Sequence, residues 1–386
     1  MYFWLQEHSQ HFASVTGEAP ARITLRTLLA AICSFVLAVI LGPWIIRWLQ
    51  TRYREPNVSD CKQLEQLHSS KQWTPTMGGL FITAGIVAAT LLLGDLGNPY
   101  LPAAVVLTLG LCVVGYWDDW RKLTFGRGLS ARAKLAAQFV VASAVVAMIY
   151  STQQSTPHGL ELIIPFSGTT IPLGVWFIPL SIVVILGSSN AVNLTDGLDG
   201  LACGCLVFAL AAMGSLVYVA GHTEWATHLS VPKISGAGEL TIVTAAAIGA
   251  ILGFLWFNCH PAQVFMGDTG SLPLGGLLGF LAIVARQELL LIVIGGVFVA
   301  EALSVLLQVG YYRWRQRRIF RCAPLHHHFQ LIGWSESKIV VRFWIAAALC
   351  AILGLAALSG NPRKPMTNDF NPSSVISHQL SVVNGR

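Results

Sequence analysis

The feature that most constrains the fold is a series of long apolar segments between residues 27 and 359. A helix of about 20 apolar residues crosses the hydrocarbon core of a bilayer. By that measure we expect about ten transmembrane helices, near 27–49, 77–94, 100–117, 132–150, 173–190, 200–220, 240–257, 272–286, 288–312 and 339–359. Only 11% of the residues are charged, against about 25% in soluble domains. The sequence predicts an all-α, polytopic membrane protein.

The remaining segments do not indicate a second folded unit. There is no internal repeat, and no polar stretch is long enough to form a soluble domain. We therefore expect one integral-membrane domain over residues 1–360, followed by a polar tail over 361–386. The first twenty residues lack a basic start and a clear cleavage site, which argues against a removed signal peptide. The eight cysteines show no C-x-x-C pair and predict neither a zinc site nor a disulfide framework.

Basic residues are distributed unevenly among the loops that ten spans would create. One set of loops holds almost all of them: Arg52, Arg54, Lys62, Lys71, Arg121, Lys122, Arg127, Arg132, Lys134, Arg313, Arg315, Arg317, Arg318, Arg321, Lys338 and Arg342. Between spans, the other set holds only Lys233 and Arg286. Cytoplasmic loops of membrane proteins carry the excess of lysine and arginine. The rich set is therefore assigned to the cytoplasm, which puts both termini on the outer, periplasmic face.

Five aspartates stand at the ends of apolar segments. They are Asp118 and Asp119 in GYWDDW, Asp196 and Asp199 in NAVNLTDGLDG, and Asp268 in VFMGDTGS. Membrane proteins place ionisable residues beside lipid mainly where function requires them. The loop assignment, made without counting these acids, puts all of them on the cytoplasmic side. Carboxylates together with phosphate oxygens are the usual ligands of magnesium, so these aspartates are candidates for one metal and phosphate site.

Each motif also has a purely structural interpretation. Asp118 and Asp119 could form a solvated helix end paired with Arg121 and Lys122. GDTGS could be a turn in which Asp268 or Thr269 caps the next helix. NAVNLTDGLDG is rich in asparagine, aspartate and glycine, which dominate turns, although the same side chains can read the amide and hydroxyl edges of a nucleoside.

A histidine triplet, His326 to His328, lies in APLHHHFQ on the same predicted face. No second ligand group at a suitable spacing supports a zinc site. Phosphate recognition or proton transfer is the favoured function, and a basic loop attracted to anionic lipid is the structural alternative. Phe265 stands three residues before Asp268, where it could stack on a base or simply pack against a helix.

Together these segments resemble the phospho-N-acetylmuramoyl-pentapeptide transferases, a branch of the polyprenyl-phosphate N-acetylhexosamine-1-phosphate transferases. The matching text is TPTMGG, GYWDDWRK, GLSARAKLAAQ, SSNAVNLTDGLDGLA, NCHPAQVFMGDTGSLPLGG and APLHHHFQLIGWSESKIVVRFW, spread in order over residues 74–344. PLHHHF favours this branch over relatives that act on N-acetylglucosamine or N-acetylgalactosamine. The chain departs from the family pattern at Trp73, where glycine is usual, and in the preceding stretch REPNVSDCKQLEQLHSSK.

The resemblance implies a reaction, a cofactor and a location. Phospho-N-acetylmuramoyl-pentapeptide would pass from its UDP conjugate, UDP-MurNAc-pentapeptide, to undecaprenyl phosphate, giving lipid I and UMP in peptidoglycan synthesis. The implied cofactor is Mg²⁺, and the implied protein is a homodimer in the bacterial inner membrane with its active site on the cytoplasmic face. Membrane lipid surrounds it, and nucleic acid is not an expected partner.

The resemblance also implies roles for single residues. Asp118, Asp119, Asp268 and His326 match catalytic motif positions, and Asp268 matches the magnesium ligand. Lys122 and Lys134 match basic positions on the phosphate side. The residues expected to recognise the nucleotide or bind substrate are Lys71, Asn193, Asp196, Asp199, Asn258, Phe265 and His327, with Phe265 under the uracil. Asp118 is the candidate for orienting or deprotonating the acceptor, and a two-step route through a covalent aspartyl intermediate stays open.

Three other functions compete with this one. A sister transferase would use UDP-N-acetylglucosamine instead. A cation-coupled transporter places carboxylates near the middle of its spans, and Glu301 in FVAEALSV is the one residue that favours this alternative. A non-catalytic lipid-binding scaffold would not need three acidic clusters and a histidine run on one side of the membrane.

Overall fold

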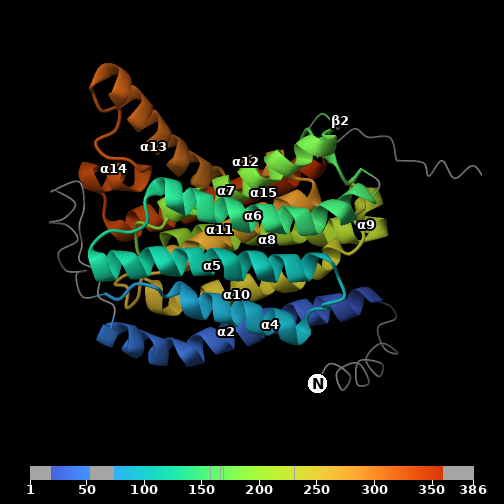
Figure 1. Ribbon diagram of the computed structural model, residues 1–386, viewed down its shortest axis with the longest axis horizontal. Coiled ribbons are helices and arrows are strands. Elements are labelled where there is room, and N and C mark those ends of the chain that lie inside the picture. Colours follow the sequence, from blue (N-terminus) through green and yellow to red (C-terminus); the bar gives the residue numbers. More distant parts are fainter. Residues whose placement is uncertain are drawn as a thin grey trace, which may run out of the picture.

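A computed structural model describes residues 19–52, 74–156, 158–165, 167, 169–229 and 231–359. Its long helices run side by side along the longest axis of the molecule (Figure 1). Two features of the sequence, Lys71 and Trp73, lie outside the described residues, as does the expected tail over 361–386. The prediction of an all-α, multi-pass membrane protein is confirmed, apart from one small hairpin.

The apolar segments all fold as helices. The long ones are α2 (Ala19–Arg52), α4 (Gly79–Leu93), α5 (Tyr100–Phe125), α6 (Ala131–Gln154), α7 (Phe177–Thr195), α8 (Leu201–Gly221), α10 (Leu240–Asn258), α11 (Asp268–Ala285), α13 (Gly296–Arg315) and α15 (Glu336–Ser359). The apolar segment before α13 forms a shorter helix, α12 (Glu288–Ile294). Two short helices, α9 (Thr223–His228) and α14 (Leu325–Ile332), lie in connections. Within the described ranges, eight helices are long and apolar enough to cross a membrane, or up to nine if α12 and α13 form one span. The expected count of about ten and the placement of the termini stay predictions.

Two of the expected spans differ from simple membrane helices. The segment expected over 77–94 folds as α4, which has only 15 residues and is about 22 Å long at 1.5 Å per residue. The segment expected as one span over 288–312 is broken, because α12 and α13 meet at an angle of 87°. The break falls at Gly295 and Gly296, where the absence of side chains makes a helix easy to interrupt. The expected single helix is therefore two helices, which can still form one broken span, and α13 leans away from the bundle in Figure 1.

The connection between α6 and α7 contains a hairpin that the sequence did not predict. Strand β1 (Glu161–Ile163) pairs in antiparallel fashion with β2 (Thr170–Pro172), and Leu162 lies opposite Ile171. Each strand has three residues, which is too short for alternation of polar and apolar side chains to be recognised.

Helix α11 is the centre of the bundle. Every one of its residues is buried, and it packs against α5 and α7. Small residues permit this close packing between helices: a side chain at Gly275 or Gly279 would collide with Ser188 of α7. The position of α11 relative to α7 is therefore set by close contacts along the middle of the helix.

The C-terminal end of α11 is held by a buried ion pair. The Arg286 guanidinium is fully buried, lies 4.6 Å from the centre of the Phe177 ring, and places Nη1 3.5 Å from Oε1 of Glu288. Glu288 is buried as well, so each charge depends on the other for compensation.

We expect Arg286→Ala to lower the free energy of unfolding by about 3–5 kcal/mol, because it leaves a buried carboxylate without its counter-charge. Replacing both partners, as in Arg286→Met with Glu288→Leu, should cost less because no charge stays buried. Thermal unfolding in detergent micelles measures both, with the exposed Lys233→Ala as control. Equal losses in the single and double variants would contradict a role for the ion pair.

Candidate active site

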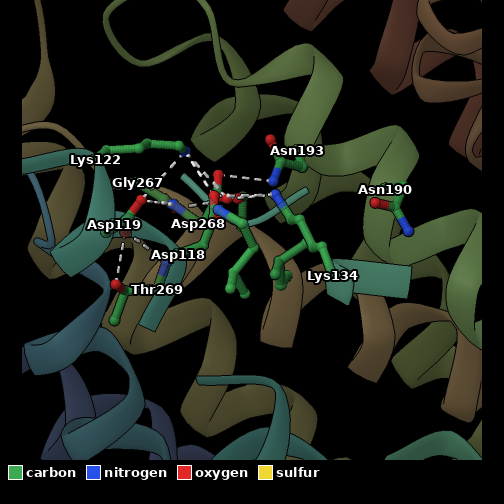
Figure 2. A network of polar contacts seen from close by, with 12 residues as sticks. Asp118, Asp119, Lys122, Lys134, Asn190, Asn193, Gly267, Asp268 and Thr269 are labelled. Atoms are coloured by element: carbon green, nitrogen blue, oxygen red, sulfur yellow. Dashed lines mark hydrogen bonds and ion pairs between the residues drawn. The ribbon is translucent and has the colours of Figure 1, made fainter. Parts of the chain in front are cut away.

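Three aspartates from two helices meet at one end of the bundle. Asp118 and Asp119 lie near the C-terminus of α5, and Asp268 is the first residue of α11. All three are buried, and one oxygen from each lies within 4.8 Å of the others. Figure 2 shows the carboxylates gathered with two lysines between them. The expected convergence of GYWDDW and GDTGS is confirmed by this geometry, whereas the roles of the residues stay predictions.

Asp119 is bound to the first turn of α11. Its carboxylate accepts hydrogen bonds from the backbone N–H groups of Asp268 (3.2 Å) and Thr269 (3.0 Å), and from the Thr269 hydroxyl (2.7 Å). The first N–H groups of a helix have no partner within the helix, and a carboxylate there also meets the positive end of the helix dipole. The helix cap that the sequence suggested within GDTGS is thus supplied by Asp119, from another helix.

Gly267 makes this contact possible. Its φ is +70°, a value that residues with a side chain rarely adopt. A Cβ atom at this position would also lie 2.6 Å from Oδ2 of Asp119. The glycine before Asp268 is therefore required by both backbone conformation and space.

Two lysines neutralise most of the negative charge. Nζ of Lys122 lies 2.9 Å from Asp118 Oδ2, 3.2 Å from Asp268 Oδ2 and 3.5 Å from Asp119 Oδ1. Lys134, in the first turn of α6, pairs with Asp268 and lies 3.6 Å from Asp118 Oδ2. Ionised, these five groups carry a net charge of −1. Without the lysines, three buried carboxylates would oppose one another's ionisation.

Further bonds connect the acids to neighbouring motifs. Asp118 Oδ1 accepts a hydrogen bond from the backbone N–H of Leu129, at 2.6 Å, in the loop before α6. The Asn193 side chain donates to Asp268 Oδ1 at 2.8 Å. Lys122, Lys134 and Asn193 thus contact the acids, whereas their expected roles in phosphate binding and nucleotide recognition stay predictions. The sequence did not indicate Thr269 as a partner of Asp119, because the two are far apart along the chain.

The three carboxylates suit a divalent cation with hard oxygen ligands. The oxygens of Asp119 already accept three hydrogen bonds from α11, so Asp118 and Asp268 are the more available ligands. Their present partners at Oδ2 are the lysine ammonium groups, and these long side chains can turn toward an anionic substrate. The donor set therefore fits Mg²⁺.

A second group with metal-ligating side chains consists of Asp199, His260 and Glu336. His260 Nδ1 lies 3.0 Å from Asp199 Oδ2 and 3.7 Å from Glu336 Oε2. The same carboxylates accept backbone N–H groups, Asp199 from Ala262 at 3.1 Å and Glu336 from Asp199 at 3.0 Å. These bonds connect the start of α8, the loop before α11 and the start of α15.

Three of the residues expected on the nucleotide side, Asp199, Asn258 and Phe265, lie in this network of loops. Asn258 accepts a hydrogen bond from the Gly200 N–H at 3.0 Å and donates to the Val264 carbonyl at 2.8 Å. The backbone N–H of Phe265 donates to the Pro75 carbonyl at 2.8 Å, which attaches TPTMGG to the same loop. Asp196 directly follows the end of α7. Asn258 and Asp199 thus help to hold the loops in place, which their expected role did not predict.

The histidine triplet forms the first half of α14 rather than joining the acids. His326 is fully buried, and among the described residues no hydrogen bond or ion pair joins it to Asp118, Asp119 or Asp268. His327 faces Gln330 in its own helix, with Nδ1 2.9 Å from Oε1. The histidine triplet therefore does not belong to the acidic cluster, whose aspartates come from GYWDDW and GDTGS alone.

Comparison with known proteins agrees with this arrangement. The profile of glycosyl transferase family 4 matches residues 101–286. A phospho-N-acetylmuramoyl-pentapeptide-transferase from Solidesulfovibrio magneticus is 45% identical over 370 residues, which cover 93% of this chain and 99% of that protein. A protein of the same name from Thermodesulfovibrio yellowstonii is 46% identical over 340 residues, covering 87% of this chain and 93% of the relative.

The compared relatives share one name, and the identity extends over nearly the whole of both chains. The sister transferases and the transporters are therefore not favoured. From its motifs, its helices and these relatives, the chain belongs to the phospho-N-acetylmuramoyl-pentapeptide-transferase family.

Proposed function

We propose that this chain transfers phospho-N-acetylmuramoyl-pentapeptide from UDP-MurNAc-pentapeptide to undecaprenyl phosphate, giving lipid I and UMP. The observation that carries this proposal is the buried group of Asp118, Asp119 and Asp268 with two lysines among them. Such a site can bind a divalent cation and then two phosphate-bearing substrates. The names of its relatives support phospho-N-acetylmuramoyl-pentapeptide as the transferred group.

In this proposal Asp268 is the magnesium ligand. When bound, Mg²⁺ neutralises charge on the UDP pyrophosphate and stabilises the departing UMP. Lys122 and Lys134, which now pair with the carboxylates, would bind the phosphate oxygens of the substrates. Asp119 keeps the first turn of α11 in position, because its oxygens are already engaged there.

Asp118 orients the acceptor. A phosphate monoester has a second pKa near 6, so the acceptor is largely deprotonated at neutral pH and needs little help from a general base. Holding the reactants in position then supplies most of the rate. Asp118 is a better candidate than Asp119 because only one of its oxygens, Oδ1, accepts a backbone N–H, that of Leu129. Both oxygens of Asp119 accept backbone N–H groups from α11.

The nucleotide is proposed to lie over the neighbouring loops. Its contacts would come from Lys71, Asn193, Asp196, Asp199, Asn258 and Phe265, with Phe265 under the uracil, and His326 and His327 would serve the phosphate side. The distribution of basic residues supports a cytoplasmic active site in the inner membrane, about ten spans and both termini outside. The homodimer is proposed from the resemblance to the family.

Activity should depend on both the sugar and the metal. We expect purified protein to release UMP from UDP-MurNAc-pentapeptide and undecaprenyl phosphate with Mg²⁺, and not from UDP-N-acetylglucosamine. Asp268→Asn should lower kcat/KM by about 10²- to 10³-fold, since a metal contributes several kcal/mol to the transition state. The matched control is Asp95→Asn, an exposed acid near the opposite end of α5. Release without magnesium, or from UDP-N-acetylglucosamine alone, would refute the proposal.

Substitution of Asp118 and of Asp119 should have different effects on stability and activity. Asp119→Asn turns an amide group toward backbone N–H donors and should lower the free energy of unfolding by about 1–3 kcal/mol along with activity. Asp118→Asn keeps an oxygen for Leu129 and should lose activity with less effect on stability. Thermal unfolding and single-turnover UMP release distinguish the two. Near-normal turnover by Asp118→Asn, with no covalent intermediate trapped, would exclude both roles considered for Asp118.

A further inference from the structure

Glu301 is a buried acid that the proposed chemistry does not use. It lies in the second turn of α13 and has no exposed surface. A carboxylate in this setting is costly unless its hydrogen bonds are made. Its presence near the middle of an apolar segment was the one feature that favoured a transporter.

The contacts of Glu301 lead to the histidine triplet. Oε2 accepts a hydrogen bond from the backbone N–H of Leu325 at 2.7 Å, and Oε1 accepts one from the N–H of His326 at 3.2 Å. These are the first two residues of α14. Glu301 therefore caps α14 from another helix, as Asp119 does for α11.

The same carboxylate also lies beside the His326 ring. Oε1 is 3.3 Å from Nδ1, and neither group is exposed. A carboxylate next to one ring nitrogen of a histidine fixes the ring orientation and leaves the other nitrogen to face the opposite side. Glu301 thus lies at ion-pair distance from Nδ1, which makes no hydrogen bond within the described residues, and accepts a hydrogen bond from the backbone N–H of the same residue.

On the opposite side, Nε2 faces the loop that follows α7. A side chain at Gly197 would collide with Nε2 of His326, so the loop passes directly over the ring. Gly197 comes immediately after Asp196, in the motif that also supplies Asn193 to the acidic cluster. Nε2 has no hydrogen-bond partner within the described residues, and a buried polar nitrogen of this kind requires one. The ring thus lies between a carboxylate and the loop expected to meet the nucleotide.

We propose that Glu301 is a positioning residue for the transfer reaction, acting through His326: it caps the first turn of α14 and aligns the imidazole so that Nε2 faces the Asp196–Gly197 turn. The inference rests on the proposed function, because it assigns Glu301 to the same site. It also gives Glu301 a role that does not involve transport.

A double-mutant cycle tests the proposal. Glu301→Gln should lower kcat for UMP release by about 10- to 100-fold, the usual loss for a residue that orients a functional side chain, with a smaller change in KM. In a His326→Gln background, the same substitution should cause little further loss. Glu301→Asp should retain more activity than Glu301→Gln, because it keeps the carboxylate.

The cycle also separates positioning from stability. Glu288→Gln is the matched control, since it is a buried glutamate on the other side of the bend and faces Arg286 rather than His326. It should leave kcat unchanged. Normal kcat in Glu301→Gln, or losses that add independently with His326→Gln, would overturn the proposal. If Glu301→Gln does not fold, the same cycle is measured with Glu301→Asp. An inactive wild-type protein under these conditions would instead refute the proposed transferase function.

Discussion

Three carboxylates buried within a few ångströms of one another require positive charge, and the rest of the site depends on how this chain supplies it. Lys122 comes from the same helix as Asp118 and Asp119, and Lys134 comes from the next helix. In a poorly solvated site, such charges interact much more strongly than in water. Each lysine contacts more than one of the carboxylates, so the two together hold the three acids close to one another.

The scaffold that keeps these charges in place is α11. Its complete burial and its small residues let α5 and α7 approach closely, and its first residue is Asp268. Asp119 connects the end of α5 to the first turn of α11. Asp268, the proposed metal ligand, and Asp119, which caps its helix, therefore come from two different helices. A shift of α5 or α11 would move Asp268.

The same arrangement occurs at the N-terminus of α14, the helix that carries the histidine triplet. Glu301 binds the first N–H groups of α14, as Asp119 binds those of α11. In both places an acid from a neighbouring span compensates a helix N-terminus, where N–H groups would otherwise be unpaired inside the protein. This explains why a carboxylate occurs within the apolar sequence of α13.

The sequence by itself determined the class of fold, because long apolar segments can satisfy their backbone groups in a membrane only as helices. It also identified the acids of GYWDDW and GDTGS as candidates for a functional site, because ionisable residues are costly in such a chain. It did not reveal the break at Gly295, the hairpin, or the hydrogen bonds that connect Asp119 to Thr269 and Glu301 to α14. These depend on contacts between residues far apart in the chain, and only the packing of the helices decided them.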